Sequence, residues 1–391
     1  MSRTPFGRPR IPSNYYVWCE PPDDAGDEVL HFVSGMRSLT LKGHSFREFT
    51  RLVVPLLDGK HTWSEIQELA ADVFRPEDLA ACLELLEQQN VLEDADQWLG
   101  DETPRRMEPQ LNLFHDLGGK GAGAREKLAA ATVSVLGLGG CGTTAALSLA
   151  AAGVGTLRLI DALEVRETDV YFTPALQLAA GGASRAAVAG RMIDASAPQV
   201  AVRVCDSKLE SDADLRAVVE GSSFVVCCLD PGQSNLVFKL NRVCLDLAIP
   251  WTCCALAGTE IILGPTVHPD GGPCYLCYRM RSVACAGNPE DAFELERRLD
   301  RRKQDDSGRS ENLVFSAGAA GNLIGVEVLK ELTGMAAPSL VGKIAVFDLL
   351  EHSIAKHVVL RMPSCPVCSG RRSREEAATA ATVGRAGTTN D

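Results

Sequence analysis

The sequence lacks an excess of basic residues. Its 391 residues include 39 Lys and Arg against 51 Asp and Glu, which gives a formal net charge of −12 at pH 7. An acidic chain repels phosphate backbones unless it keeps a local basic patch. We therefore expect no nucleic-acid partner.

Long apolar segments are also lacking. No run of about 18 strongly apolar residues that could cross a bilayer is present, and residues 1–16 contain no apolar core of an export signal. These absences predict a cytoplasmic protein without a membrane partner. In a reducing compartment, the 14 Cys are expected to be metal ligands and core thiols rather than a disulfide framework.

Hydrophobic residues, by contrast, are plentiful at 46%, and the chain length fits two to three domains of about 150 residues each. Residues 1–27 carry five prolines and are expected to form an extended lead-in. Residues 28–95 predict a hairpin, three helices and a returning strand. This order is typical of a small winged-helix α+β domain.

The three helices of this first domain carry start signals. Ser45 and Thr62 are residue types that cap helix N-termini with a side-chain oxygen, and Glu65 would complete a capping box with Thr62. Pro76 suits the first turn of the third helix. Helices are therefore expected to begin at these positions.

A linker over residues 96–125 is expected to lead into the main domain, residues 126–369. From residue 131 onward strands alternate with helices, which indicates a doubly wound, Rossmann-like α/β fold with a parallel sheet. Its last strands are expected to be antiparallel. Residues 370–391 are polar and Ala-rich and are expected to form a disordered tail.

A glycine loop opens the main domain. Gly137, Gly139 and Gly142 form G-x-G-x-x-G between a strand and a helix, so the free amide groups of the helix start would face a phosphate. Asp161 ends the next strand, where an acid accepts hydrogen bonds from a ribose. The motif predicts a nucleotide site. The alternative is that the glycines only permit close packing of helix on strand, as in a site that has lost its ligand.

Two C-x-x-C pairs stand far apart in the main domain. Cys274 with Cys277, and Cys365 with Cys368, provide four thiolates at the spacing of a closed tetrahedral zinc site. Such a site is structural because it leaves no open position for a substrate. The alternative is two independent redox pairs or core thiols.

The remaining cysteines give weaker signals. Those in apolar strands are expected to be small core residues, namely Cys227, Cys228, Cys253 and Cys254. Cys285 follows the first C-x-x-C pair, and Arg279 and Arg281 nearby would lower its pKa and favour a nucleophilic thiolate. The alternative for Cys285 is an incidental loop thiol, and no catalytic residue is assigned firmly.

Taken in order, these motifs resemble the ThiF and MoeB-like adenylating fold, the prokaryotic relatives of ubiquitin-activating enzymes. GLGGCG, LAAAGVGTLRLID, CCLD and the paired C-x-x-C motifs follow the family's order over about residues 110–369. The resemblance implies a homodimer, ATP and magnesium. The residues that it assigns to them are Gly137, Gly139, Gly142, Asp161 and Asp230.

The sequence departs from this family where the triphosphate would lie. Phe172 stands where the family has an Arg, Asp169 where it has an Asn, and Arg185 where it has a Lys. Each lost charge-assisted contact would weaken ATP binding by about 1.5–3 kcal/mol. These departures from the family pattern therefore imply a weakened ATP site.

Residues 28–95 resemble the PqqD-like peptide-recognition element, which binds a leader peptide as an added strand. The resemblance implies a peptide groove lined by five leucines. These are Leu39, Leu41, Leu79, Leu83 and Leu86. The alternatives are an ordinary winged helix with these leucines in its core and a DNA-binding winged helix, which the acidic charge disfavours.

The two resemblances together, with the ending VVLRMPSCPVCSG, are similar to the leader-peptide-binding partner proteins of azole-forming, YcaO-dependent cyclodehydratases. The function implied is a non-catalytic subunit that presents the precursor of a bacteriocin-type thiazole/oxazole-modified peptide to a YcaO enzyme and activates that enzyme. The alternative is an ATP-dependent adenylating enzyme that activates the C-terminus of a peptide or a sulfur carrier.

Overall fold

The structure is a computed structural model that describes residues 7–98, 105–118, 121–173, 176, 182–301 and 312–370. It contains two compact units. The first comprises Met1–Lys127 with Thr333–Ala336, and the second comprises Leu128–Leu332 with Ala337–Asp391. The predicted tail lies outside the described residues from position 371 onward, as do positions 1–6 of the predicted lead-in.

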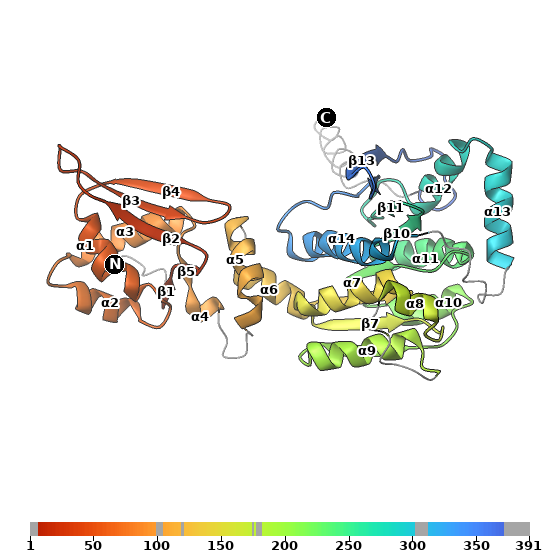
Figure 1. Ribbon diagram of the computed structural model, residues 1–391, viewed down its shortest axis with the longest axis horizontal. Helices are drawn as coiled ribbons and strands as arrows, with labels where there is room; N and C mark the ends of the chain where they lie inside the picture. The colour runs from red at the N-terminus through yellow and green to blue at the C-terminus, as the bar shows by residue number, and fades with distance from the viewer. Residues whose placement is uncertain are drawn as a thin grey trace, which may run out of the picture. The chain divides into compact units, whose positions relative to one another are not determined.

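The first unit contains a three-stranded antiparallel sheet in the order β2 (Tyr16–Glu20), β3 (Glu28–Val33) and β4 (Ser38–Gly43) (Figure 1). The predicted hairpin of β3 and β4 is confirmed. Strand β2, however, lies in the segment expected to be an extended lead-in. Its Tyr-Val-Trp run favours a strand, and the prolines of the segment lie outside it.

The helices that follow this sheet up to residue 98 are α1 (Phe46–Leu52), α2 (Trp63–Ala70), α3 (Pro76–Gln88) and the short α4 (Ala95–Trp98), with a 3-10 turn η1 (Val54–Leu56). The capping box is confirmed, because Thr62 Oγ1 accepts from the N–H of Glu65 at 3.3 Å and Glu65 Oε2 accepts from the N–H of Thr62 at 2.7 Å. Pro76 begins α3 as predicted.

The predicted cap at Ser45 is wrong. Ser45 has a φ of 63° and its side chain makes no capping hydrogen bond, because a capping residue normally needs an extended backbone. The carboxylate of Glu28, on β3, replaces it by accepting from the N–H of Arg47 at 2.9 Å. The start of α1 is therefore capped by Glu28, a residue distant in sequence, and not by Ser45.

The core of the first unit lies between the sheet and the helices. Leu30 and Phe32 of β3 pack there against helix residues, among them Leu79, Leu83 and Leu86 of α3, which are at most 3% exposed. These three leucines therefore offer no surface to a peptide, and the structure favours the core alternative for them. Leu39 and Leu41 are half-buried against the same core. The winged-helix assignment stays a prediction.

Residues 93–130 form further short elements. Strand β5 (Glu93–Asp94) pairs with β1 (Pro9–Arg10). Within the segment expected to be a linker, the structure contains η2 (Arg105–Met107), α5 (Glu108–Asp116) and the start of α6 (Gly121–Ala130). Helix α5 forms there because Leu111 and Phe114, one turn apart, are both buried.

The second unit is built on an eight-stranded sheet in the order β13-β12-β11-β10-β9-β6-β7-β8. Five strands are parallel: β6 (Thr132–Leu136), β7 (Thr156–Ile160), β8 (Ala201–Cys205), β9 (Phe224–Cys227) and β10 (Trp251–Ala257). Three are antiparallel: β11 (Glu260–Leu263), β12 (Lys343–Asp348) and β13 (Ser353–Val358). The predicted α/β fold is confirmed.

The helices of the second unit are α7 (Gly140–Ala151), α8 (Glu167–Phe172), α9 (Arg185–Ser196), α10 (Asp212–Val219), α11 (Ser234–Asp246), α12 (Tyr275–Ala284), α13 (Pro289–Arg301) and α14 (Val314–Thr333). Helices α7 and α9 contact each other and β7, whereas α10 and α11 form a separate pair (Figure 1). Among the described residues, none of the helices is long and apolar enough to traverse a bilayer.

The order of the sheet sets the position of a site. Strand β6 lies in the middle, with β7 on one side and β9 on the other. The chain therefore leaves β6 and β9 in opposite directions across the sheet. In doubly wound folds, a crevice forms beyond the carboxyl ends of strands at such a point.

Candidate functional site

The glycine loop follows β6 and is closely packed. Gly137 has a φ of +83°, and a Cβ on it would lie 2.4 Å from the carbonyl oxygen of Cys228. A Cβ on Gly142 would lie 1.8 Å from the carbonyl oxygen of Gly137. Both glycines are therefore required by packing alone, whatever the loop binds. Gly139 is less crowded, because a Cβ on it would lie 3.4 Å from Oδ1 of Asp230.

Asp161 stabilises this loop from the end of β7. Its Oδ2 accepts from the N–H of Leu138 at 2.7 Å, and its Oδ1 accepts from the N–H of Leu163 at 2.9 Å. Burial raises the pKa of Asp161, although Arg185 and these two N–H groups oppose the rise. The predicted ribose acid thus already holds two backbone segments together.

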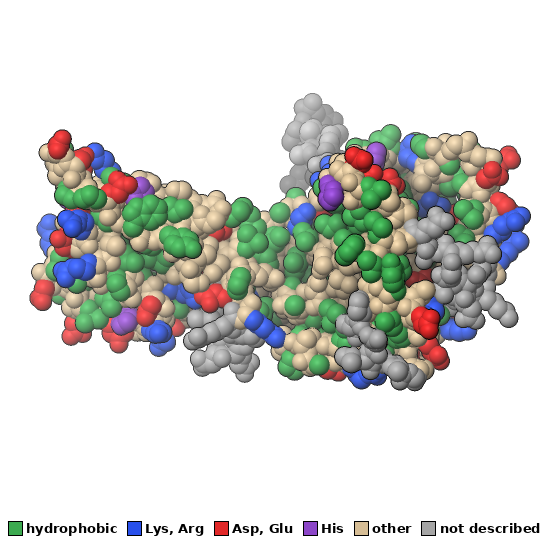
Figure 2. Space-filling view, viewed as in Figure 1, with side chains coloured by type: hydrophobic (Ala, Val, Ile, Leu, Met, Phe, Trp, Pro, Cys, Tyr) green, Lys and Arg blue, Asp and Glu red, His purple; other side chains and the backbone are tan. Residues whose placement is uncertain are grey.

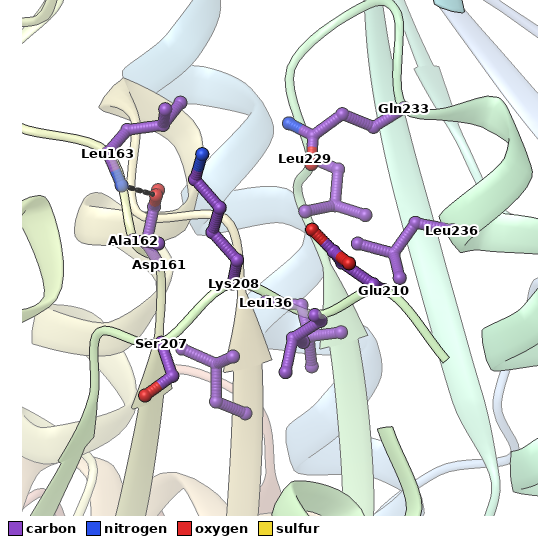
Figure 3. Close-up of a pocket in the computed structure, with 12 residues that line it drawn as sticks. Leu136, Asp161, Ala162, Leu163, Ser207, Lys208, Glu210, Leu229, Gln233 and Leu236 are labelled. Carbon is purple, nitrogen blue, oxygen red and sulfur yellow. Dashed lines mark hydrogen bonds between the residues drawn. The ribbon is translucent and has the colours of Figure 1, made fainter. Parts of the chain in front are cut away.

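A cavity of about 270 Å³ opens beside Asp161, at the carboxyl ends of β6, β7 and β9. Its apolar wall includes Leu136, Ile160, Leu229 and Leu236. Its polar lining comprises Asp161, Ser207, Lys208, Glu210 and Gln233 (Figure 3). An apolar pocket with a few polar groups is the usual form of a small-molecule site.

A network of charged residues fills the other side of the loop. Arg185 is the first residue of α9, whose start is capped by the side chain of Ser184. Its guanidinium donates to Asp169 through Nε at 2.7 Å and through Nη2 at 2.5 Å. Nη1 donates to Asp230 at 2.7 Å and lies 3.4 Å from Asp161. One side chain that is 1% exposed therefore contacts three carboxylates.

This arrangement keeps Arg185 charged. Burial alone disfavours the cation, but the carboxylates of Asp230, Asp169 and Asp161 outweigh burial and raise the pKa of Arg185 above its usual value. The sequence placed Arg185 where the family holds a phosphate-binding cation. In the structure, its guanidinium is engaged by protein carboxylates instead.

Arg166 is a second cation at this position, and sequence reasoning missed it. Its Nη2 donates to Oδ2 of Asp230 at 2.8 Å, and its Nε lies 3.7 Å from Asp169. The N–H of Arg166 also donates to Asp169 at 2.9 Å, at the start of α8. Two arginines and three aspartates thus form one network with a formal charge of −1.

Phe172 ends α8 next to the glycine loop. A Cβ on Gly140 would lie 2.7 Å from the Cβ of Phe172. An apolar residue therefore lies beside the loop where the resemblance predicted a basic one.

The four predicted metal-ligand cysteines come together. Cys274 and Cys277 lie at the start of α12, and Cys365 and Cys368 follow β13. The Sγ atoms of Cys274 and Cys365 are 3.7 Å apart, those of Cys277 and Cys368 are 3.6 Å apart, and all four lie within 4.8 Å of one another. Metal–sulfur bonds of about 2.3 Å in a tetrahedral site separate the sulfurs by about 3.8 Å. The arrangement therefore fits a tetrahedral metal ion.

Cys285 does not lie in the environment proposed for a nucleophile. It is exposed at the C-terminal end of α12, next to the negative end of the helix dipole. Arg279 pairs with Glu296 at 3.0 Å, and Arg281 donates to the carbonyl oxygen of Leu360 at 2.6 Å. The structure thus favours an incidental thiol at this position.

Sequence reasoning also missed Lys208 and Gln233. Lys208 follows β8 and Gln233 follows β9, and both strands end at the crevice. A position after such a strand was the one feature of the sequence that could have pointed to these residues. The sequence alone does not show which residues of these long connections turn toward the cavity.

The buried network predicts a large effect for Arg185→Met. The substitution keeps an elongated side chain but leaves three carboxylates without their shared cation, so we expect the free energy of unfolding to fall by about 3–5 kcal/mol. Arg191→Met, at an exposed position of the same helix, is the control and should change it by no more than about 0.5 kcal/mol. Denaturant unfolding of both variants measures the difference, and equal effects would contradict this account of the network.

Comparisons with known proteins agree with this architecture. The sulfur carrier protein adenylyltransferase of Thermus thermophilus is 27% identical over 281 residues, which cover 70% of this chain and 96% of that protein. The molybdopterin-synthase adenylyltransferase of Escherichia coli is 26% identical over 250 residues, covering 62% of this chain and 89% of the relative.

Solved structures extend the likeness over more of the chain. The microcin C7 biosynthetic enzyme MccB in complex with N-formylated MccA is similar with a TM-score of 0.66 and 18% identity, and the match covers 92% of this chain and 99% of that one. The structure of MccB from Escherichia coli with ATP matches with a TM-score of 0.65. At this identity, the likeness shows the fold. The sequence profile of the ThiF family matches residues 107–367, and the chain belongs to the ThiF family.

Proposed function

We propose that this chain is a peptide-binding, non-catalytic ThiF-family protein in the biosynthesis of a ribosomally made thiazole/oxazole-modified peptide. It binds the leader of the precursor, presents the precursor to a separate YcaO-type cyclodehydratase and activates that enzyme. The single observation that carries this proposal is the engagement of Arg185 by three carboxylates.

Triphosphate binding depends on cations that are available to the phosphates. Here Arg185 and Arg166 both donate to Asp230, and Phe172 is apolar. To bind ATP with magnesium, Asp230 would have to leave both arginines, and the remaining network would have to accept a highly negative ligand. Among the described residues that line the cavity, Lys208 is the one basic side chain. The charges therefore favour a site that no longer performs adenylation.

An adenylating enzyme is the second candidate, and the cavity beside Asp161 favours it. In that case Gly137, Gly139, Gly142 and Asp161 would hold ATP, and Asp230 would hold magnesium. ATP supplies an adenylyl group for a C-terminal carboxylate. The similarity to sulfur carrier and molybdopterin-synthase adenylyltransferases supports this candidate.

Peptide binding is supported by the free edge of β4. Among the described strands, β4 pairs only with β3. The N–H of Ser34 donates to the carbonyl oxygen of Arg37 across the hairpin turn at 2.8 Å, and hydrogen-bonded pairs alternate along an antiparallel ladder. Leu39 and Leu41 therefore bond to β3, whereas the backbone groups of Ser38, Thr40 and Lys42 point to the free edge.

The outer face of the same sheet carries aromatic residues. Tyr16 and Trp18 are 76% and 43% exposed, and Trp18 stacks on His31 with ring centroids 4.7 Å apart. In the space-filling view, hydrophobic side chains gather over this sheet (Figure 2). A peptide that extends the sheet along β4 would gain main-chain hydrogen bonds, with apolar surface nearby. The peptide complex of the structurally similar MccB is consistent with this assignment.

The four-cysteine group is proposed to hold structural zinc. Four thiolates in a closed set are typical ligands of Zn²⁺, and the N–H of Met362 donates to Sγ of Cys277 at 3.4 Å as an outer hydrogen bond. Zinc here would join α12 to the segment after β13. It would contribute no open position for catalysis.

A homodimer is proposed as the assembly. Exposed apolar residues gather on and beside the edge strand β13, namely Leu350, Ile354, Val358 and Leu360. An exposed apolar edge of this kind normally pairs with another surface.

The proposed division of labour predicts binding without adenylation. Mixed with the precursor peptide encoded beside it, the purified protein should bind with nanomolar to micromolar affinity and should not exchange pyrophosphate into ATP above the background without protein. Isothermal titration and the exchange assay measure the two properties. Peptide-dependent exchange that disappears in Asp230→Ala would instead establish the adenylating enzyme.

Strand addition at β4 predicts different effects for two substitutions at one position. Thr40→Pro removes an N–H that faces the free edge and leaves the β3–β4 ladder bonds in place, so affinity for the precursor should fall by about tenfold or more. Thr40→Ala keeps the N–H and should change affinity by no more than roughly twofold. Circular dichroism confirms folding, and equal affinities of the two folded variants would refute strand addition at this edge.

Zinc predicts a stoichiometric metal content. Elemental analysis of the purified protein should find one zinc per chain at the four cysteines, and the double variant Cys365→Ser, Cys368→Ser should lose it. Cys285→Ser, an exposed cysteine outside the group, is the control and should keep the metal. Well under one zinc per chain in the unmodified protein would exclude the assignment.

A further inference from the structure

Three other cysteines converge beneath the glycine loop. Cys141 lies in the first turn of α7, Cys228 directly follows β9, and Cys254 lies in β10. The Sγ atom of Cys141 is 2.9 Å from that of Cys254 and 3.5 Å from that of Cys228, and the latter two are 3.6 Å apart. The three elements thus bring three sulfur atoms into mutual contact.

The sheet register explains this convergence. Cys227 of β9 pairs with Cys253 of β10 in parallel register, so the next residues of the two strands, Cys228 and Cys254, lie side by side and face the opposite side of the sheet. Helix α7 covers that side and adds Cys141. Cys253, by contrast, donates its thiol to the carbonyl oxygen of Gly264.

The geometry resembles that of the four-cysteine group. Two of the sulfur–sulfur distances among Cys141, Cys228 and Cys254, 3.5 and 3.6 Å, are close to the 3.6 and 3.7 Å of the four-cysteine group. Three sulfurs that each lie about 2.3 Å from a cation in their plane are about 4.0 Å apart. The two longer distances would therefore have to increase by roughly half an ångström, and the distance between Cys141 and Cys254 by roughly 1 Å. Within the described part of the chain, the group offers three ligands and no fourth.

We propose that Cys141, Cys228 and Cys254 form a second thiolate metal site, which binds a soft, thiophilic cation of the Cu(I) type through three sulfurs. Thiolates select soft cations, and three sulfurs suffice for Cu(I), whereas structural zinc takes four protein ligands. Binding releases the thiol protons to solvent.

A cation can reach the three cysteines from one side, and its binding would connect separate segments of the chain. Cys141 and Cys228 are buried, while Cys254 is partly exposed and gives a cation access. Cys141 lies between Gly140 and Gly142, and Cys228 lies two residues before Asp230. A bound cation would therefore join the glycine loop to β9 and β10 and restrain the segment that carries Asp230.

Titration with Cu(I) tests the site. Full-length protein as purified, with its zinc content measured beforehand, is titrated with Cu(I) delivered as a chelator complex. We expect one Cu(I) per chain to be taken from the chelator with no zinc released, a sulfur coordination number of three by X-ray absorption, and a rise in Tm. Copper uptake matched by zinc release, coordination by four sulfurs or no uptake would each overturn the proposal.

Substitutions locate the copper. Cys254→Ser changes the most accessible ligand, and Cys141→Ala places a good helix former in α7, so at least one folded variant is expected. Both should lose Cu(I) uptake and keep zinc. Cys244→Ala removes a buried thiol of α11 outside the group and should keep uptake. Unchanged uptake in a folded Cys254→Ser or Cys141→Ala variant would overturn the assignment.

Discussion

The buried guanidinium of Arg185 is the interaction on which the centre of the second unit depends. A charge in this position is stable only because carboxylates from three chain segments meet it, after β7, in α8 and after β9. The same contacts fix the position of Asp161, which in turn holds the backbone of the glycine loop through Leu138. Loop, helices and strand ends are therefore parts of one electrostatic unit.

The network of Arg185 and its carboxylates divides the crevice into two parts with different properties. The part beside Asp161 keeps a cavity with apolar walls and polar side chains such as Lys208 and Gln233. The part at the start of α7, where a helix end attracts anions, is adjacent to a network of net negative charge and to Phe172. A ThiF-family fold can thus retain its central pocket while the charged residues beside the glycine loop bind one another, and this contrast is the physical basis of the proposed non-catalytic role.

The sequence predicted those parts of the molecule that depend on local spacing. The glycine loop, the alternation of strands and helices and the two C-x-x-C pairs are local patterns, and the structure has each of them. It could not predict the partner of Arg166 or the meeting of Cys141 with Cys254, because these contacts join residues 64 and 113 positions apart. The leucine stripe of α3 shows another limit, since helical spacing identifies an apolar face but not whether a core or a ligand covers it.

The four-cysteine group joins residues that are 91 positions apart in the chain, Cys274 with Cys365 and Cys277 with Cys368. Between them lie α13, α14 and the two strands that complete the antiparallel end of the sheet. During synthesis, the parallel strands β6 to β10 are available to pair long before the second pair of cysteines emerges from the ribosome. The parallel part of the sheet can therefore fold early, whereas β11 keeps an unpaired edge until β12 is made. A nascent chain that stalls in this interval would expose that edge to other chains, which makes the interval before Cys368 the period in which aggregation competes with folding.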